Sequence, residues 1–378
     1  MRWDNLTLSG TSAQDALFGA GEVITRTFDT PEFRGMTFYE VRARSVLNKV
    51  PGSSRMPFAW TVNPYRGCGH ACRYCLQGET PILMANGRTR RLMDLRVGDA
   101  IYGTVRDGGY RRYALTEVLA HWRTIKPAYR VTLEDGTELV ASGDHRFLTE
   151  RGWKHVTGRM NGAARRPYLT TGNELSGTGK FAAPPKDSAD YRRGYLCGIV
   201  RGDAHLGTYS YSHRRRADRN HRFRLALIDL EAQERARRYL TDSGVQTCEF
   251  EAINDIIRWP DYPDDDWSKG FLAGIFDAGG SCSGGILRIA STDTEIIKSV
   301  TSCLARLGFT FAVERSARPS GLQCVRLLGG MCERLRFFHT VDPAISRKRS
   351  IAGMAIKNRA RLKVVSVEEL GIELPMYD

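Results

Sequence analysis

The chain of 378 residues carries a formal net charge of +14, from 56 Lys and Arg against 42 Asp and Glu, and 42% of its residues are hydrophobic. This length exceeds one ordinary core and predicts two or three domains in a globular protein. No apolar run approaches the roughly 18 residues that span a bilayer, and the N-terminus lacks the pattern of a signal peptide. The nine cysteines are an odd number in a long chain, which argues against a secreted disulfide framework. We therefore expect a soluble, cytoplasmic protein with no membrane partner.

Three cysteines follow one another closely in the first fifth of the chain. Cys68, Cys72 and Cys75 have the spacing C-x3-C-x2-C, and three thiolates this close can ligate three irons of a 4Fe-4S cluster. A structural zinc site is the alternative, but no second cysteine pair follows at zinc-like spacing. The stretch before the cysteines carries a strand pattern near 36–44 and no catalytic motif.

The motif that runs from Asn63-Pro-Tyr through these cysteines resembles the radical S-adenosylmethionine enzymes of the spore-photoproduct-lyase-like branch. The resemblance covers about residues 57–75 and implies a 4Fe-4S cluster and S-adenosylmethionine as cofactors. It implies that residues 1–74 are the start of such an enzyme. The strands and helices of its barrel do not follow Cys75, so a second kind of segment begins there.

The chain after Cys75 predicts an all-β segment. Residues 81–92 form two short strands around an Asn-Gly turn, and residues 97–102 form another strand. Residues 129–142 alternate on both arms of a hairpin with Asp-Gly at its tip. The segment ends in Ser142-Gly-Asp-His145.

These stretches resemble the ordered sequence blocks of inteins. Cys75-Leu-x-Gly-Glu-Thr-Pro-Ile is similar to the first block, residues 136–149 to the second, and residues 362–378 to the opening of the penultimate block. The resemblance implies an all-β Hint (horseshoe) splicing domain made of residues 75–175 and 360–378. Ser142 stands where the family has threonine, which keeps the hydroxyl group.

The resemblance implies Cys-initiated splicing at the Tyr74–Cys75 bond. Cys75 would attack the Tyr74 carbonyl and convert the amide into a thioester, which requires a well-placed nucleophile and an acid for the departing nitrogen. The family implies that His145 donates to that nitrogen, that Ser142 orients the group, and that Asp378 activates the thiol or couples later steps. A lone histidine is more often structural, but the position of His145 after a matched first block favours the catalytic interpretation. Splicing in this family also needs a terminal His-Asn pair, so we expect either a longer sequence or a short C-terminal intein segment as partner.

Two stretches in the middle of the chain resemble the paired helices of LAGLIDADG (DOD-type) homing endonucleases. They are residues 194–207 and 270–281, and the resemblance implies an inserted α+β endonuclease domain over 185–345. Small residues at Gly198, Gly202 and Gly274 predict two helices that cross with their backbones nearly in contact. Residues 294–308 predict an amphipathic helix with a glycine stop.

The same resemblance implies one acidic residue at the foot of each helix, where carboxylates hold Mg²⁺ for phosphodiester cleavage. Asp203 occupies this position in the first helix and Gly279 in the second, while Asp277 falls on a position of helix-end structure. Because one carboxylate is missing, a nickase and a domain that only binds DNA remain alternatives. Buried helices without a nuclease role are a further alternative.

Two basic clusters, at 213–224 and 347–363, predict contact with the phosphate backbone of double-stranded DNA. A solvated basic face is the alternative. Strand patterns at 222–227 and 286–291 would place arginines in the major groove. The candidate DNA-binding residues are Arg214, Arg215, Arg216, Arg222, Arg224 and Arg288.

The interpretation that joins these features is an intein-containing precursor in which the intein interrupts the cluster motif of its host. Cys75 would leave with the intein, so the first residue of the downstream host segment would have to be a cysteine that completes the cluster site. Two other hypotheses remain. One is a divergent iron–sulfur radical enzyme, and the other is a DNA-binding protein that has lost splicing and cleavage.

Overall fold

The computed structural model describes residues 6–8, 23–28, 37–41, 47–49, 60–62, 75–158, 167–210, 219–225, 227–245, 250–315, 321–356 and 362–378, with only the backbone before residue 75, at 206–222 and at 250–251. The chain divides into two compact units, residues 1–72 and residues 73–378. No helix among the described residues is long and apolar enough to cross a membrane.

The first unit contains short antiparallel strands. Their bounds are β1 Leu6–Leu8, β2 Val23–Phe28, β3 Thr37–Val41, β4 Leu47–Lys49 and β5 Trp60–Val62. The first three form one sheet in that order, and β4 pairs with β5. The strand expected near 36–44 is therefore present as β3. The cluster-motif residues Cys68 and Cys72 lie outside the described residues.

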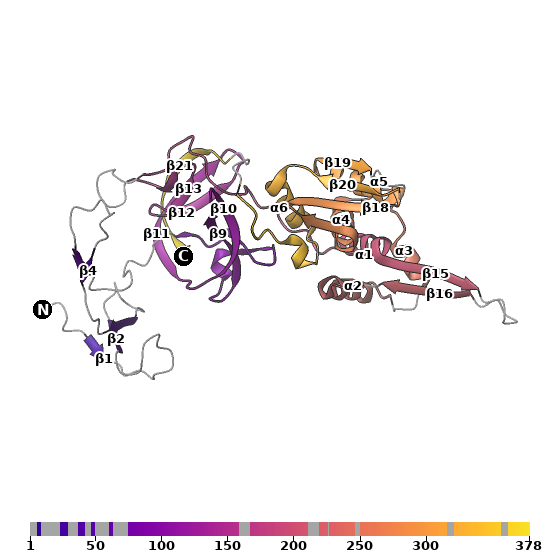
Figure 1. The fold of residues 1–378 in the computed structure, drawn as a ribbon, viewed down its shortest axis with the longest axis horizontal. Helices are drawn as coiled ribbons and strands as arrows, with labels where there is room; N and C mark the ends of the chain where they lie inside the picture. Colours follow the sequence, from indigo (N-terminus) through magenta and orange to yellow (C-terminus); the bar gives the residue numbers. More distant parts are fainter. Residues whose placement is uncertain are drawn as a thin grey trace. The chain divides into compact units, whose positions relative to one another are not determined.

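The second unit begins with a part built from strands, which we call the barrel part (residues 75–158, 167–178 and 362–378). Its elements are β6 Leu76–Gln77, β7 Pro81–Leu83, β8 Thr89–Arg91, η1 Leu92–Asp94, β9 Ala100–Asp107, β10 Tyr110–Glu117, β11 Arg123–Leu133, β12 Glu138–Ser142, β13 Arg146–Thr149, β14 Gly152–His155 and β21 Val364–Tyr377. Strands β11, β12, β6 and β21 close a barrel in that order, while β7–β8, β9–β10 and β13–β14 are hairpins (Figure 1).

The expected turns form where the sequence supplies glycine. Gly87 and Gly136 adopt φ values of +77° and +79° at the tips of the β7–β8 and β11–β12 hairpins, a conformation that favours glycine. The strand expected at 97–102 begins only at Ala100. The prediction is wrong at its start because the Asp99 N–H donates to the Arg96 carbonyl across a turn that contains Gly98 at φ +89°.

Strand β21 completes the barrel from the far end of the chain. It runs antiparallel along β11, with Leu133 opposite Val364 at one end and Arg123 opposite Tyr377 at the other. Its last residue also pairs with β6, where Tyr377 lies opposite Leu76. This pairing brings the end of the chain beside the start of β6.

The remainder of the second unit, which we call the helical part (residues 187–356), mixes helices with sheets. Its elements are α1 Ala189–Asp203, β15 Ala204–Ser210, β16 Arg219–Leu225, α2 Leu230–Asp242, α3 Phe250–Ile256, α4 Asp265–Gly279, β17 Gly280–Ser283, β18 Ile286–Ser291, α5 Thr294–Arg306, β19 Phe311–Arg315, β20 Gln323–Leu327, α6 Gly330–Val341 and η2 Ser346–Arg349. Strands β17, β18, β20 and β19 form one sheet in that order, and β15 pairs with β16. The helix expected at 294–308 is α5, and Gly308 follows it with φ +69°.

Helices α1 and α4 cross with their backbones in contact. Side chains cap both N-termini, since Ser188 accepts from the Tyr191 N–H and Asp264 from the Trp267 N–H. A Cβ atom added at Gly198 would overlap the Phe271 carbonyl, and one added at Gly274 would overlap the Tyr195 carbonyl. The predicted close crossing is confirmed.

Two further glycines, which were not predicted from the sequence, lie at the crossing of α1 and α4. A Cβ atom at Gly194 would overlap the Trp267 carbonyl, and one at Gly270 would overlap the Tyr191 carbonyl. These two positions lie one helical turn before Gly198 and Gly274. The contact therefore runs over two turns of each helix.

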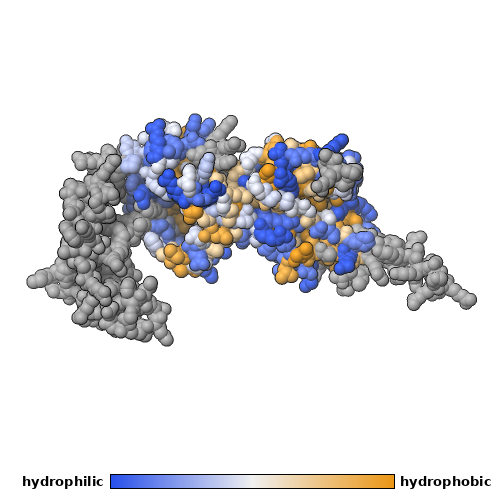
Figure 2. Space-filling model, viewed as in Figure 1, coloured by the Kyte–Doolittle hydropathy of each residue, from blue (hydrophilic) through white to orange (hydrophobic). Residues whose placement is uncertain are grey.

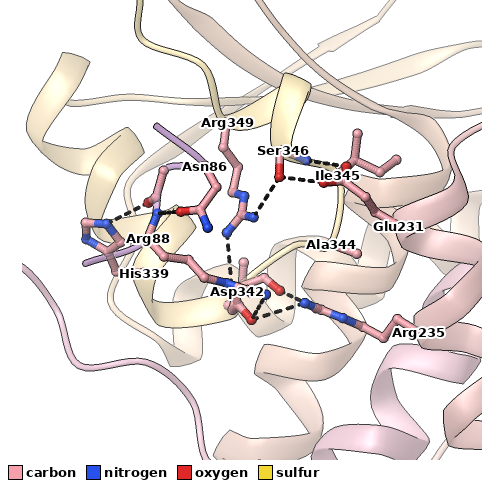
Figure 3. A network of polar contacts seen from close by, with 12 residues as sticks. Asn86, Arg88, Glu231, Arg235, His339, Asp342, Ala344, Ile345, Ser346 and Arg349 are labelled. Atoms are coloured by element: carbon pink, nitrogen blue, oxygen red, sulfur yellow. Dashed lines mark hydrogen bonds and ion pairs between the residues drawn. The ribbon is translucent and has the colours of Figure 1, made fainter. Parts of the chain in front are cut away.

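A cluster of polar groups around Asp342 joins the helical part to the barrel part (Figure 3). Asp342 ends α6 in the left-handed conformation, with φ 50°. Arg88, in the turn between β7 and β8, donates from Nε and Nη2 to its two carboxylate oxygens at 2.8 and 2.9 Å. Arg235 of α2 and Arg349 of η2 donate to the same carboxylate at 3.2 and 3.0 Å. One carboxylate therefore binds three guanidinium groups from three segments of the chain.

Backbone groups extend this junction. The buried His339 ring donates from Nε2 to the Gly87 carbonyl at 3.1 Å, and burial lowers the pKa of His339, which favours the neutral ring. In β10, the Tyr113 N–H donates to the Met354 carbonyl at 3.0 Å, and the Gly353 N–H donates to the Tyr113 carbonyl at 2.8 Å. The β7–β8 turn and strand β10 are thus both hydrogen-bonded to the helical part.

We predict that Gly274→Ala destabilises the protein by about 3 kcal/mol or more, because overpacking against backbone cannot be relieved by a side-chain rotation. The free energy of unfolding from urea titration measures the effect. Gly279→Ala is the matched control at the end of the same helix, where the nearest atom to an added Cβ is the Ala290 carbonyl oxygen at 3.4 Å. Equal stability of Gly274→Ala and the parent would contradict the close crossing.

A second prediction concerns pH. Burial opposes ionisation of Asp342, but the hydrogen bond from Arg88 and the charges of Arg235 and Arg349 outweigh it and hold its pKa below the usual value. A depressed folded-state pKa contributes stability that is present above the unfolded pKa of about 3.9 and is lost as the pH falls through the folded value. Asp342→Asn, which suits a left-handed backbone, should therefore be less stable than the parent at pH 6, by a margin that shrinks below about pH 4.

Urea titrations of both proteins across this pH range provide the measurement. Asp261→Asn, at an exposed aspartate, controls for the change in net charge. A stability difference between Asp342→Asn and the parent that stays constant down to pH 3 would show that the carboxylate charge does not stabilise the junction.

Candidate functional site

Cys75 directly precedes β6 and is completely buried. Its backbone N–H donates to Ser142 Oγ at 3.3 Å, and the Ser142 N–H donates to the Cys75 carbonyl at 2.9 Å. Strand β12 ends at Ser142, and its pairing with β6 through Ala141 and Leu76 sets this contact. Tyr74 lies outside the described residues. The hydroxyl of Ser142 is thus bound directly to the amide nitrogen of Cys75.

An acid–base pair lies on the other side of Ser142. The Ser142 hydroxyl donates to Asp144 Oδ1 at 2.7 Å, and Lys126 Nζ lies 2.6 Å from Asp144 Oδ2. The side chains of Lys126 and Asp144 are only 12% and 15% exposed. Neither residue was predicted from the sequence. The only local signal was an acid two residues after Ser142.

His145 and Asp378 line one cavity of about 350 Å³, together with hydrophobic side chains that include Leu76 and Tyr377. The His145 N–H donates to the Ser142 carbonyl at 3.0 Å, which holds the histidine in the turn after β12. Asp378 follows β21, and its backbone exchanges two hydrogen bonds with Trp122, at 3.1 and 3.2 Å. The cavity therefore adjoins β6 on the side where the chain ends.

Asp203 is the last residue of α1 and is exposed. Partial burial raises its pKa, and the charge of Lys348 opposes that change. Gly279, which ends α4, supplies no carboxylate. Instead, Lys348 Nζ donates to the carbonyls at 276, 277 and 278, at 3.0, 2.6 and 3.4 Å. The feet of the two helices are therefore chemically different, with a carboxylate on one and an ammonium group on the other.

Asp277 has a structural environment. It is buried and accepts from the Tyr195 hydroxyl at 2.9 Å and from the backbone N–H groups of Ala344 and Ile345 at 2.7 and 3.1 Å. Burial raises its pKa against these hydrogen bonds. The carboxylate connects α1, α4 and the segment after α6, in agreement with the helix-end position assigned to it.

The residues fit a divalent metal ion only in part. The described residues contain no group of three or more His, Cys, Asp or Glu side chains that could hold an ion. Mg²⁺ is commonly bound by one or two carboxylates together with substrate phosphates. Asp203 therefore fits one ion shared with DNA, whereas the glycine at 279 does not fit a symmetrical pair of ions.

Two arginines lie opposite each other on the four-stranded sheet. Arg288 of β18 is in register with Arg326 of β20, and the buried residues alternate with them on both strands. Because alternate residues face opposite sides of a sheet, both arginines lie on the face away from the core. Glu314 of β19 binds Arg326 at 2.7 Å. Because like charges directly opposite are unfavourable and Glu314 already pairs with Arg326, Arg288 is the better candidate of the two arginines for contact with a phosphate.

The other predicted DNA contacts are only partly described. Arg224 of β16 is exposed. Arg222 lies in the same strand, but its side chain is outside the described residues, as are the positions at 214–216. The sequence analysis did not predict Arg326, because polar and hydrophobic residues alternate only weakly along its strand, β20. On the face shown in Figure 2, hydrophilic residues cover most of the coloured surface of both parts, with small hydrophobic patches between them.

Comparison with curated proteins finds only partial relatives. Uncharacterized proteins of Mycobacterium bovis and Mycobacterium tuberculosis are 45% identical over 84 residues, which is 21% of this chain and 25% of each relative. The replicative DNA helicase DnaB of Rhodothermus marinus is 36% identical over 84 residues, which is 22% of this chain and 9% of that protein. The chain thus spans a quarter or less of the length of these relatives.

Three solved structures also resemble parts of the chain. I-DmoI in complex with DNA and Mn is 16% identical, with a TM-score of 0.34 over 41% of this chain and 97% of that one. The gp41-1 intein is 26% identical, with a TM-score of 0.20 over 27% of this chain and 66% of that one. A DnaB intein from Synechocystis sp. PCC 6803 is 21% identical, with a TM-score of 0.23 over 27% and 67%.

The family model described as a LAGLIDADG-like domain matches residues 266–341. This range covers α4 to α6 and includes the second of the two predicted motif helices. Residues 266–341 of the chain are therefore similar to a LAGLIDADG-like domain.

Proposed function

We propose that the chain is an intein-containing precursor that cleaves its own Tyr74–Cys75 bond and carries a DNA endonuclease within the splicing domain. The observation that supports the splicing role most directly is the buried Cys75, whose amide nitrogen binds the Ser142 hydroxyl. The cavity lined by His145 and Asp378 supports it further.

The first step is an acyl shift from nitrogen to sulfur. The Cys75 sulfur adds to the carbonyl carbon of Tyr74, and the carbon–nitrogen bond of the Tyr74–Cys75 amide breaks. The thiol loses one proton and the nitrogen gains one. The nitrogen thereby becomes the free amine of Cys75. His145 carries that proton to the nitrogen, because the departing amide needs an acid, and Asp378 assists the thiol.

The host segment is the start of a radical S-adenosylmethionine enzyme. In this proposal Cys68 and Cys72 become two ligands of a 4Fe-4S cluster. Cys75 leaves with the intein, and a cysteine at the start of the downstream host segment takes its place. Completion of splicing would require that residue and a terminal His-Asn pair.

The endonuclease acts on double-stranded DNA of the host gene and cuts one strand. Asp203 would hold Mg²⁺ together with a DNA phosphate, and the chemistry that such an ion supplies is activation of water and stabilisation of the leaving oxygen. Arg224 and Arg288 neutralise phosphates of the backbone. Gly279 supplies no carboxylate at the second position, so the second strand lacks an equivalent site.

The splicing proposal predicts that added dithiothreitol releases a fragment ending at Tyr74, and that Cys75→Ala abolishes this release. Dithiothreitol releases the fragment because it exchanges with the thioester at Tyr74. Cys75→Ala abolishes release because no thioester forms without the Cys75 sulfur. Intact-mass spectrometry of the products is the measurement. Cys282→Ala, at a half-buried cysteine of the helical part, should release the fragment at the parental rate.

For the endonuclease we predict that Asp203→Asn lowers magnesium-dependent nicking of the uninterrupted host gene by about 10²-fold or more, the scale of losing one catalytic group. Relaxation of a supercoiled plasmid measures nicking, and a salt titration measures DNA binding, which should stay unchanged. Asp190→Asn, at an exposed residue in the first turn of the same helix, is the control. Nicking that survives Asp203→Asn would refute the assignment, and a parent that binds without nicking would leave DNA binding as the activity.

A further inference from the structure

We infer that Asp144 and Lys126 are positioning residues for the first splicing step, and that they act by fixing the direction of the Ser142 hydroxyl toward the scissile amide. The inference rests on the proposed splicing function. It adds two residues that no sequence block suggested.

The hydroxyl of Ser142 has one proton and two lone pairs to distribute. Its proton is directed to Asp144 Oδ1 at 2.7 Å, so a lone pair is left to accept the Cys75 N–H at 3.3 Å. A serine hydroxyl without such an acceptor is free to rotate and can direct its proton toward the amide instead. Asp144 therefore determines that Ser142 acts as an acceptor at this nitrogen.

Lys126 holds the Asp144 carboxylate in place. It contacts the carboxylate oxygen that does not bind Ser142, so it restricts rotation of the group that accepts the Ser142 proton. Lys126 Nζ lies 2.6 Å from the second oxygen, and both side chains are largely buried, so removal of either partner leaves an uncompensated charge.

The fold places these groups without contributions from the helical part. Ala128 of β11 is in register with Ser142 of β12, and Lys126 lies two residues before Ala128 on the same face of β11. His155 of β14 contacts the Asp144 backbone carbonyl through Nδ1 at 3.1 Å. Three strands therefore fix the turn that carries Asp144.

The chemical consequence concerns the leaving nitrogen. As the thiol adds, this nitrogen becomes tetrahedral and develops a lone pair that must receive a proton. Because the Cys75 N–H remains hydrogen-bonded to Ser142, the orientation of this nitrogen is fixed. Its new lone pair therefore points in one defined direction. A proton donor such as His145 then meets a nitrogen in a single orientation, which is the advantage of positioned groups.

The test is a double-mutant cycle on the full chain, with residues 1–74 in place, measured as the rate of thiol-induced release of the fragment ending at Tyr74. We expect Asp144→Ala and Lys126→Met each to slow release by about tenfold. In a Ser142→Ala background, Asp144→Ala should change the rate by less than about twofold, because a residue that acts only through Ser142 has no further effect. Asp144→Asn, which keeps an acceptor oxygen, should recover part of the rate, as should Lys126→Arg.

Glu138→Ala is the matched control, since it removes an acid from an exposed ion pair with Arg130 on the same β11–β12 hairpin. Thermal unfolding confirms that each variant is folded, and if Asp144→Ala is not, the cycle with Asp144→Asn replaces it. An equal slowing in both backgrounds, or no slowing at all, overturns the positioning role while Cys75-dependent release by the parent upholds the splicing function. Absence of release from the parent overturns both.

Discussion

The pairing of β21 with β11 and β6 is the constraint on which the rest of the second unit depends. Strand β6 has two residues, and it is held by β12 through Ala141 and by the last residues of β21. Cys75 directly precedes this short strand. Because β21 comes from the far end of the chain, the whole helical part lies between β12 and β21 in chain order, and these two strands are not neighbours in the barrel. The geometry around Cys75 is therefore complete only when residues about three hundred positions away have joined the sheet.

Local patterns in the sequence were sufficient for much of this fold. The Asn-Gly and Asp-Gly turns, the glycine-lined helices and the helix before Gly308 each depend on residues close together in the chain, and each forms as predicted. The contacts that were missed join segments that are apart in the chain. Arg88 meets Asp342 across 254 positions, and Lys126 meets Asp144 across 18. Neither hydrophobic periodicity nor a sequence motif predicts such contacts, because they depend on how the strands and helices pack together. For the same reason the sequence indicated Ser142 and His145 but not the acid–base pair behind them.

The two motif helices show how a fold persists while its chemistry changes. The glycines at the crossing are restricted by backbone atoms of the opposite helix, so any side chain there would separate α1 from α4. The position at the foot of each helix has no such restriction. The residue there is an aspartate in α1 and a glycine in α4. At the end of α4, Lys348 Nζ donates hydrogen bonds to the last backbone carbonyls. Fold and activity are therefore under separate constraints, and a close helix crossing does not by itself imply two chemically equivalent sites at its foot.

The junction around Asp342 limits how the barrel part could be isolated. Two parts joined only by linkers could be separated without loss of hydrogen bonds. Here the turn at Gly87 and the backbone of β10 donate and accept hydrogen bonds with the helical part. Removal of the helical part would leave Arg88 without its carboxylate and leave backbone groups of β10 without partners, each at a cost in stability. A shortened protein made of the barrel part alone would therefore need compensating substitutions at these places.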